Sequence, residues 1–143
     1  MHNFKQLLLL RILPIIIALL GLGIAFAPQT LVPVCPIHDG HVMKCHWSAQ
    51  AELGVGIVIF LHGFILLIIR KFGRAEGGFS VFTLALLSLA IPKFLIGGCN
   101  NPDMMCQART FPVLYLLGFL TAIAGGLLLC LSNDEDAKEV NRD

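Results

Sequence analysis

The stretch FPVLYLLGFLTAIAGGLLLCLS, residues 111–132, contains no charged side chain and decides the class of fold. At about 1.5 Å of rise per helical residue, a run of this length spans the roughly 30 Å hydrocarbon core of a bilayer. The strands of a membrane barrel would instead alternate apolar with polar residues, and this run does not alternate. It therefore predicts a membrane-spanning helix.

Three further apolar runs precede it. We expect helices at about residues 7–27, 49–69, 79–98 and 111–132. The 143-residue chain is 57% hydrophobic and 13% charged, whereas soluble domains are roughly 45–50% apolar and about 25% charged. The predicted fold class is an all-α integral membrane protein, in which residues 1–132 form a single four-transmembrane-helix bundle.

The first apolar run also resembles a secretory signal peptide. Arg11 lies near its start, and Ala25-Phe26-Ala27 imitates a small-residue cleavage site. Because Pro28 directly after that site disfavours cleavage, we expect the first helix to be retained.

Basic residues are distributed unevenly over the predicted loops. Cytoplasmic loops of membrane proteins are enriched in Lys and Arg. One side of the predicted bundle carries Lys5, Arg11, Arg70, Lys71, Arg74, Lys138 and Arg142, and the opposite side carries Lys44 and Arg109. This pattern predicts a multi-pass membrane protein with both termini in the cytoplasm. The outer loops are then residues 28–48 and 99–110, and residues 133–143 form an acidic cytoplasmic tail, which we expect to be disordered.

Four of the five cysteines fall in these outer loops, as Cys35, Cys45, Cys99 and Cys106. An oxidising space on that side favours disulfides, so we expect them to tie the two loops into a small cap. Turn-forming residues between Cys99 and Cys106 favour local pairs, Cys35–Cys45 and Cys99–Cys106. A short connection between the second and third helices makes these helices antiparallel neighbours and favours Cys45–Cys99 with Cys35–Cys106. The sequence leaves both pairings open.

Besides Arg11 near the start of the first helix, two charged residues fall inside predicted membrane spans. Glu52 lies seven residues after Cys45 and Lys93 lies six residues before Cys99, so each is about two helical turns from its cysteine and their depths match. Charges in a membrane span are costly and usually pair, which predicts an intramembrane ion pair between Glu52 and Lys93. In the alternative interpretation, Lys93 extends to the headgroups and Glu52 is protonated.

The first outer loop also carries side chains that ligate metals. His38, His41, Met43 and His46 could bind copper or zinc, although oxidised cysteines would no longer be thiolate ligands. The main prediction therefore includes no metal or other cofactor. The layout of four helices with two cysteines in each outer loop resembles bacterial quinone-linked enzymes that reoxidise periplasmic disulfide catalysts. The C-x-x-C motif of their first loop is missing here.

A closer resemblance is carried by MKCHWSAQAELG, residues 43–54, and IGGCNNPDMMCQARTFP, residues 96–112. These segments resemble an uncharacterised bacterial family of four-span membrane proteins, domain-of-unknown-function family 4418, over nearly the whole chain. The resemblance implies a small membrane protein of unassigned activity that works beside ABC-type export permeases. It implies no catalytic residues.

No nucleotide-binding loop, serine elbow or zinc-protease signature occurs in the sequence. We therefore expect a non-enzymatic accessory subunit of a larger membrane complex, and the resemblance implies that this complex is one such as an ABC-type exporter in a bacterial cytoplasmic (inner) membrane. The expected partners are the lipid bilayer and a membrane permease or another membrane protein. The formal net charge of +1 offers no basic excess for nucleic acid, so no nucleic-acid partner is expected. The alternatives are a disulfide-generating membrane thiol oxidoreductase and a copper- or zinc-binding outer-loop receptor.

Overall fold

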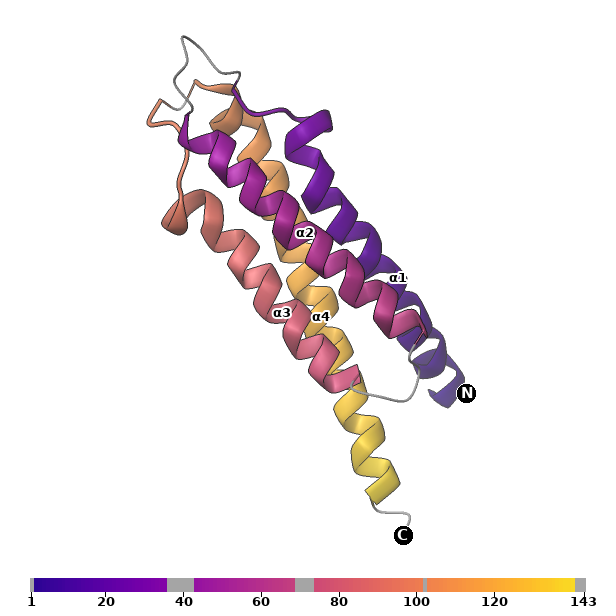
Figure 1. Cartoon of the computed structure of the whole chain (residues 1–143). Coiled ribbons are helices and arrows are strands. Elements are labelled where there is room, and N and C mark those ends of the chain that lie inside the picture. The colour runs from indigo at the N-terminus through magenta and orange to yellow at the C-terminus, as the bar shows by residue number, and fades with distance from the viewer. Residues whose placement is uncertain (1, 36–42, 69–73, 102, 141–143) are drawn as a thin grey trace.

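The computed structural model describes residues 2–35, 43–68, 74–101 and 103–140. Its elements in chain order are α1 (His2–Phe26), η1 (Ala27–Leu31), α2 (Lys44–Ile68), α3 (Arg74–Ala90), η2 (Ile91–Leu95), η3 (Cys106–Thr110) and α4 (Phe111–Val140), where η marks a short π-helical turn. The helices run up and down in one elongated bundle (Figure 1). The start of α1 and the end of α4 lie at one end of the bundle. The segments that carry Cys35, Cys45, Cys99 and Cys106 lie at the other end.

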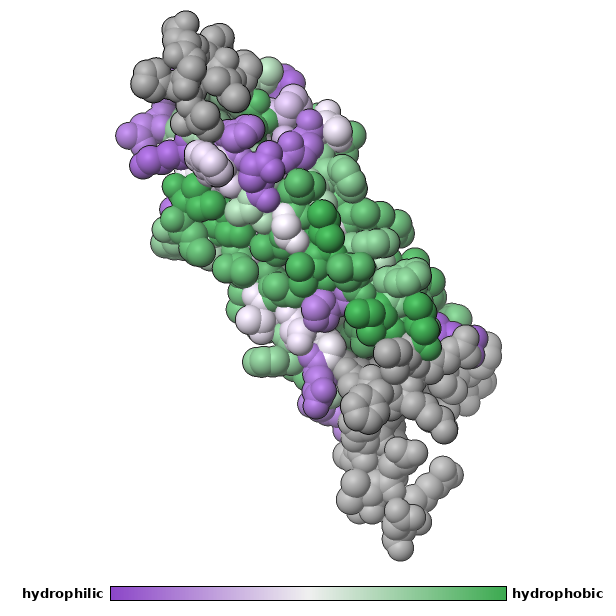
Figure 2. Space-filling view, in the orientation of Figure 1, coloured by the Kyte–Doolittle hydropathy of each residue, from purple (hydrophilic) through white to green (hydrophobic). Residues whose placement is uncertain are grey.

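Four helical segments are long and apolar enough to cross a membrane: Leu8–Leu31, Lys44–Ile68, Ala75–Leu95 and Cys106–Asn133. The visible surface has a broad hydrophobic band, with hydrophilic residues gathered above it and a few more along its lower edge (Figure 2). This band is what a bilayer core would contact. The predicted all-α, four-span membrane fold is confirmed.

The helices are longer than the apolar runs alone predicted. The second helix begins at Lys44 instead of about residue 49, and helical structure after the third begins at Cys106 instead of about residue 111. The C-terminal end of α4 extends to Val140. Most of the acidic tail, residues 133–143, is therefore helical and not disordered as expected. The reason is that helical backbone hydrogen bonds do not require apolar side chains, and hydropathy detects only the part of a helix that lies in hydrocarbon.

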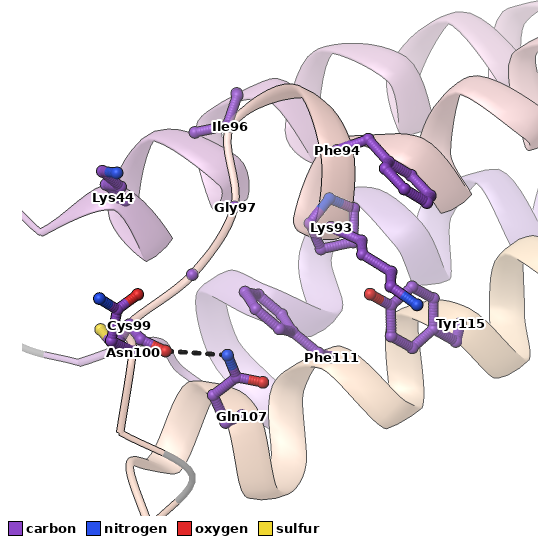
Figure 3. A pocket seen from close by; sticks show the side chains of 12 residues that line it. Lys44, Lys93, Phe94, Ile96, Gly97, Cys99, Asn100, Gln107, Phe111 and Tyr115 are labelled. Carbon is purple, nitrogen blue, oxygen red and sulfur yellow. Dashed lines mark hydrogen bonds between the residues drawn. The ribbon is translucent and has the colours of Figure 1, made fainter.

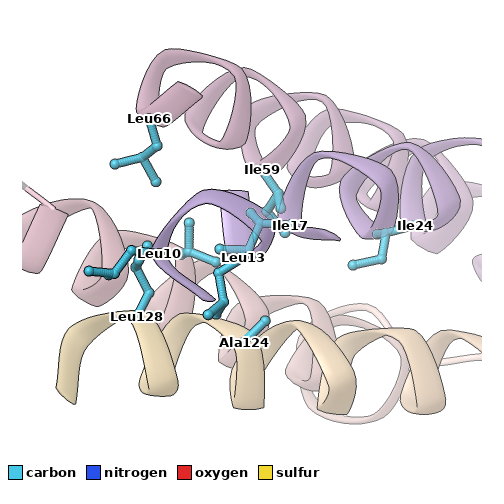
Figure 4. Packing of buried hydrophobic residues seen from close by; sticks show 9 residues of the cluster. Leu10, Leu13, Ile17, Ile24, Ile59, Leu66, Ala124 and Leu128 are labelled. Carbon is cyan, nitrogen blue, oxygen red and sulfur yellow. The ribbon is translucent and has the colours of Figure 1, made fainter. Parts of the chain in front are cut away.

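The bundle consists of two helix hairpins. Contacts are most extensive between α1 and α2 and between α3 and α4, while α2 and α3 meet over a smaller area. The second and third helices are thus neighbours, as expected, but each packs more extensively against the other helix of its own hairpin. The hairpins join through a buried apolar core that includes Leu13, Ile17, Ala124 and Leu128 (Figure 4).

Glycine lets the backbones within each hairpin approach closely. A Cβ atom added at Gly63 would lie 2.7 Å from the backbone nitrogen of Ala18 in α1. In the second hairpin, a Cβ added at Gly78 would lie 2.8 Å from the backbone nitrogen of Leu129. Small residues at such contacts are how helices pack in lipid, where apolar burial gives little driving force.

The two hairpins repeat the same construction. The first helix of each hairpin, α1 or α3, is called the outgoing helix here. Each outgoing helix ends in a π-helical turn with proline at its second position, Pro28 in η1 and Pro92 in η2. The turns close alike, because the N–H of Val32 donates to Ala27 O at 2.9 Å and the N–H of Ile96 donates to Ile91 O at 3.0 Å. Each turn is followed, at the same spacing from its proline, by a cysteine.

The second helices of the two hairpins, α2 and α4 with the preceding η3, are the returning helices, and they also correspond to each other. Met43-Lys44-Cys45 at the start of α2 matches Met104-Met105-Cys106 at the start of η3. Beyond η3, whose π-helical turn accommodates one extra residue, Gly63 matches Gly125. The corresponding positions in the two returning helices are buried alike, which includes Ile59 with Thr121 and Leu66 with Leu128. The fold is thus an internal repeat of one helix hairpin.

We predict that Gly63→Val destabilises the protein by about 1–3 kcal/mol, because its side chain would force α1 and α2 apart. Thermal unfolding in mild detergent measures the effect. Gly54→Val is the matched control on the same helix, since Gly54 is exposed and an added Cβ meets nothing within 4 Å. Equal stability losses in both variants would contradict the role given to the Gly63 contact.

Candidate metal centre

Four cysteines meet at the end of the bundle opposite the start of α1. Cys35 follows η1, Cys45 lies in the first turn of α2, Cys99 follows η2 and Cys106 opens η3. Their Sγ atoms all lie within 4.8 Å of one another. We refer to these four residues as the thiol cluster. Each hairpin contributes two of them, one after its outgoing helix and one at the start of its returning helix.

Two methionines complete the sulfur environment, and each reaches across to the other hairpin. The Cys99 Sγ lies 3.7 Å from the Met43 Sδ, and the Cys35 Sγ lies 3.7 Å from the Met104 Sδ. These contacts correspond under the internal repeat. Because each thioether touches the first cysteine of the opposite hairpin, the hairpins interlock at the cluster.

Hydroxyl groups below the cluster cross between the hairpins in the same manner. The Ser48 hydroxyl in α2 donates to the carbonyl oxygen of Gly97 at 2.7 Å. The Thr110 hydroxyl in η3 donates to the carbonyl oxygen of Val32 at 2.9 Å. Each returning helix therefore holds the chain segment that leads to the first cysteine of the other hairpin.

The cluster is largely enclosed. Cys45 and Cys106 are fully buried, whereas Cys35 and Cys99 are half-buried. Phe111 and Leu114 of α4 belong to the same apolar cluster. The backbone near Cys99 is also held in place, because the Gln107 side-chain amide donates to the Cys99 carbonyl oxygen at 2.8 Å.

The thiols outside the membrane spans differ in acidity. Burial opposes ionisation of Cys35, but hydrogen bonds from the backbone and thiol of Cys106 and from the other cluster thiols outweigh it, so the pKa of the Cys35 thiol is lowered. Burial raises the pKa of the Cys99 thiol well above its ordinary range, and the neighbouring Cys106 and Cys45 raise it further. The cluster thus favours one thiolate over several, unless a cation compensates their charge.

No disulfide joins the five cysteines, each of which the structure describes. The Sγ atoms of Cys45 and Cys99 lie 3.6 Å apart. The predicted pairs therefore stay a prediction, and this contact belongs to the pairing of Cys45–Cys99 with Cys35–Cys106. Cys130, in α4, is exposed and lies outside the cluster.

The ligand atoms expected to bind a metal in the first outer loop, those of His38, His41, Met43 and His46, are not the ones found to converge. His38 and His41 lie outside the described residues. Met43 belongs to the thiol cluster's surroundings through its contact with Cys99. His46 stands edge-on to Trp47, with ring centroids 6.2 Å apart, and is not among the residues whose ligand atoms converge. In the described part of the chain, sulfur replaces imidazole as the convergent donor.

Sequence reasoning overlooked Met104 as a member of this environment. The available signal was the motif Met-x-Cys, which occurs at residues 43–45 and again at residues 104–106. Both copies open a returning helix, so the repeated motif marks equivalent points of the two hairpins.

The structure does not bring Glu52 and Lys93 together. Glu52 is fully buried, and its Oε2 accepts a hydrogen bond from the Ser88 hydroxyl at 2.7 Å, while Oε1 has no partner among the described residues. Lys93 is exposed, with its Nζ 5.6 Å from the centre of the Phe94 ring. Matching depth did not suffice, because depth does not specify the side of the helix.

Glu52 and Ser88 depart from the internal repeat. Their counterparts are Leu114 and Ile24, both buried and apolar. The hairpin architecture therefore does not require a polar pair at this level. A buried polar pair costs desolvation unless it is fully hydrogen-bonded, and here no residue in the described part of the chain bonds to Oε1 of Glu52.

We predict that Ser88→Ile destabilises the protein by about 1–3 kcal/mol, because it leaves the buried Glu52 carboxyl without its donor. The double variant Glu52→Leu, Ser88→Ile carries the residues found at the two equivalent positions of the repeat and should recover this loss. Lys93→Met should change stability by less than about 0.5 kcal/mol. Thermal unfolding in detergent tests all three, and a Lys93→Met loss equal to that of Ser88→Ile would instead indicate an ion pair.

The geometry of the thiol cluster fits a single tetrahedral ion. Four thiolates bound at about 2.3 Å from one zinc ion lie about 3.8 Å from each other. The observed separation of 3.6 Å for Cys45 and Cys99, with all Sγ atoms within 4.8 Å, requires adjustments of about 1 Å or less. The four cysteines could therefore hold a metal ion without rearrangement of the helices.

The comparisons with known proteins give a family but no activity. Searches of curated proteins and of solved structures gave no match. The family model described as "Domain of unknown function (DUF4418)" matches residues 17–131, which include all four membrane spans in whole or in large part and every cysteine of the thiol cluster. The chain is therefore a member of the DUF4418 family.

Proposed function

We propose that this small membrane protein binds one soft metal ion, zinc or copper(I), through Cys35, Cys45, Cys99 and Cys106. The observation that carries the proposal is the convergence of four Sγ atoms, from four separate segments, to within 4.8 Å. Thiolate sulfur is the preferred donor for both ions. The expected role of the ion is to fasten the two hairpins together.

A structural role for the ion follows from the donor set. Structural zinc sites use four protein ligands, whereas catalytic sites keep one position open for water or substrate. Four cysteines leave no open position, and the fully buried Cys45 and Cys106 restrict access for a reacting molecule. Because each hairpin supplies two ligands, the free energy of metal binding would stabilise the packing of one hairpin against the other.

We further propose that the protein acts as a non-enzymatic accessory subunit of a larger membrane complex, such as an ABC-type exporter. A closed metal site and a compact helical bundle support binding more than catalysis. The excess of Lys and Arg at one end of the chain's helices supports an orientation in which both termini are cytoplasmic and the cluster lies outside the cell membrane.

The second candidate is a pair of disulfides, Cys45–Cys99 with Cys35–Cys106. It is favoured by the 3.6 Å contact between Cys45 and Cys99, and by the internal repeat, under which the two bonds are equivalent. Such bonds would also fasten the hairpins, and reversible bonds would allow thiol oxidoreductase activity. Metal content and thiol oxidation state separate this candidate from the metal centre.

We predict that protein purified in mild detergent without chelator carries about one zinc or copper ion per chain. Elemental analysis measures the ion, and alkylation under denaturing conditions followed by intact-mass measurement counts the thiols. All four cluster thiols should become reactive after chelation. A metal-free protein whose cluster cysteines resist alkylation until they are reduced would establish disulfides and exclude the metal centre.

Matched cysteine variants make this test specific. Cys45→Ser should lose most of the bound metal and lower the unfolding temperature. Cys130→Ser should keep both, because Cys130 is exposed and lies outside the cluster. Unchanged metal content in Cys45→Ser would contradict the proposed ligand set.

A further inference from the structure

A pocket of about 890 Å³ opens beside the thiol cluster. It lies between the chain segment that follows α3 and the first turns of α4, and Cys99 forms part of its wall (Figure 3). Pockets of roughly 300–1,000 Å³ are typical of small-molecule sites. The pocket is thus large enough for a ligand, and of the four cluster cysteines its lining includes Cys99.

The lining of this pocket is cationic. Among the residues that the structure describes, Lys44 and Lys93 are the charged residues of its wall, and none of the others is a carboxylate. Both lysines are exposed, so their ammonium groups can move to meet a ligand. Asn100 and the Tyr115 hydroxyl add polar groups, and Figure 3 shows the Lys93 amine directed toward Tyr115. This combination of two cations with hydrogen-bonding neighbours suits an anion.

The two lysines lie at the same boundary of the membrane. Lys44 is the first residue of one candidate span, and Lys93 lies close to the end of another, Ala75–Leu95. Lipid phosphates occupy this level of a bilayer, between hydrocarbon and water. Next to Lys93, Phe94 is 78% exposed, which offers an apolar surface to an acyl chain just below a bound headgroup.

The internal repeat shows that the fold does not require this cationic pocket. The counterpart of Lys93 in the first hairpin is Gln29, whose side chain donates to the carbonyl oxygen of Ala49 at 3.3 Å. The counterpart of Lys44 is Met105, and that of Tyr115 is Leu53. The same skeleton therefore occurs once with cations and once without them.

We propose that the pocket binds the phosphate group of an anionic phospholipid, with Lys44 and Lys93 as its cationic contacts. The lipid headgroup would sit against the loop that carries Cys99, and its chains would extend along the exposed surface near Phe94. Binding at this position would couple the lipid composition of the membrane to the end of the bundle where the hairpins interlock.

The test uses the full-length protein in nanodiscs that contain equal amounts of phosphatidylglycerol and phosphatidylcholine. After release into mild detergent, native mass spectrometry counts the lipids that remain bound. We expect a roughly 10- to 30-fold preference for phosphatidylglycerol, since each lysine near an anionic lipid contributes roughly a fivefold effect. Equal retention of the two lipids would overturn the proposal.

Three variants identify the source of the preference. Lys44→Gln with Lys93→Met should abolish it, and Lys93→Arg should retain it. Arg109→Gln is the matched control, because Arg109 is an exposed cation in η3 near the same boundary but does not line the pocket. Loss of preference in Arg109→Gln equal to that in the double variant would show general surface attraction and overturn the pocket as the site.

Inorganic phosphate distinguishes a lipid from a free anion. Retention of phosphatidylglycerol in the presence of millimolar phosphate supports the lipid, whereas its displacement by phosphate alone would overturn the lipid as occupant. A single symmetric elution peak and unchanged cluster thiol reactivity establish that each variant is folded.

Discussion

The close approach of helix backbones at glycine is the contact on which the rest of the structure depends. In a bilayer, apolar side chains gain little by leaving lipid for protein, so helices associate through tight packing and polar contacts. Gly63 against Ala18 and Gly78 against Leu129 provide that packing within each hairpin. The fixed distance between outgoing and returning helices then determines where the two cysteines of each hairpin can lie. A thiol cluster with Sγ atoms within 4.8 Å needs both hairpins to hold that geometry.

The internal repeat explains how four separate segments reach one point. A hairpin that carries cysteine after its proline turn and another at the start of its returning helix presents two thiols at one end. Two such hairpins, packed through a shared core, present four. The crossing contacts of Met43 with Cys99 and of Met104 with Cys35 follow from the same arrangement. One structural unit, used twice, is sufficient to generate the cluster.

Hydropathy predicted the membrane fold because the bilayer imposes it: a long uncharged run must be helical when no water is present to satisfy its backbone. The same reasoning could not place helix ends, since Lys44 and the acidic residues before Val140 lie in helices whose ends extend past the apolar runs. Hydropathy and depth also could not identify Ser88 as the hydrogen-bond partner of Glu52. Two residues of equal depth meet only if their helices present them to each other, and Glu52 instead faces Ser88. The repeated Met-x-Cys motif could have indicated the cluster, but only after the repeat was recognised.

Differences between the two hairpins indicate where function has been added to the fold. Glu52 and Ser88 occupy positions equivalent to those of the apolar residues Leu114 and Ile24. Lys93 likewise occupies the position equivalent to that of the neutral Gln29. A buried carboxyl whose Oε1 has no partner among the described residues is unfavourable for stability, and the repeat accommodates buried apolar side chains at both equivalent positions, Leu114 and Ile24. Packing alone therefore gives no reason to keep the polar residues. Glu52 comes from the first hairpin and Ser88 from the second, so their hydrogen bond, like the thiol cluster above it, depends on how the hairpins are docked. A ligand or partner that shifts one hairpin against the other would alter both at once.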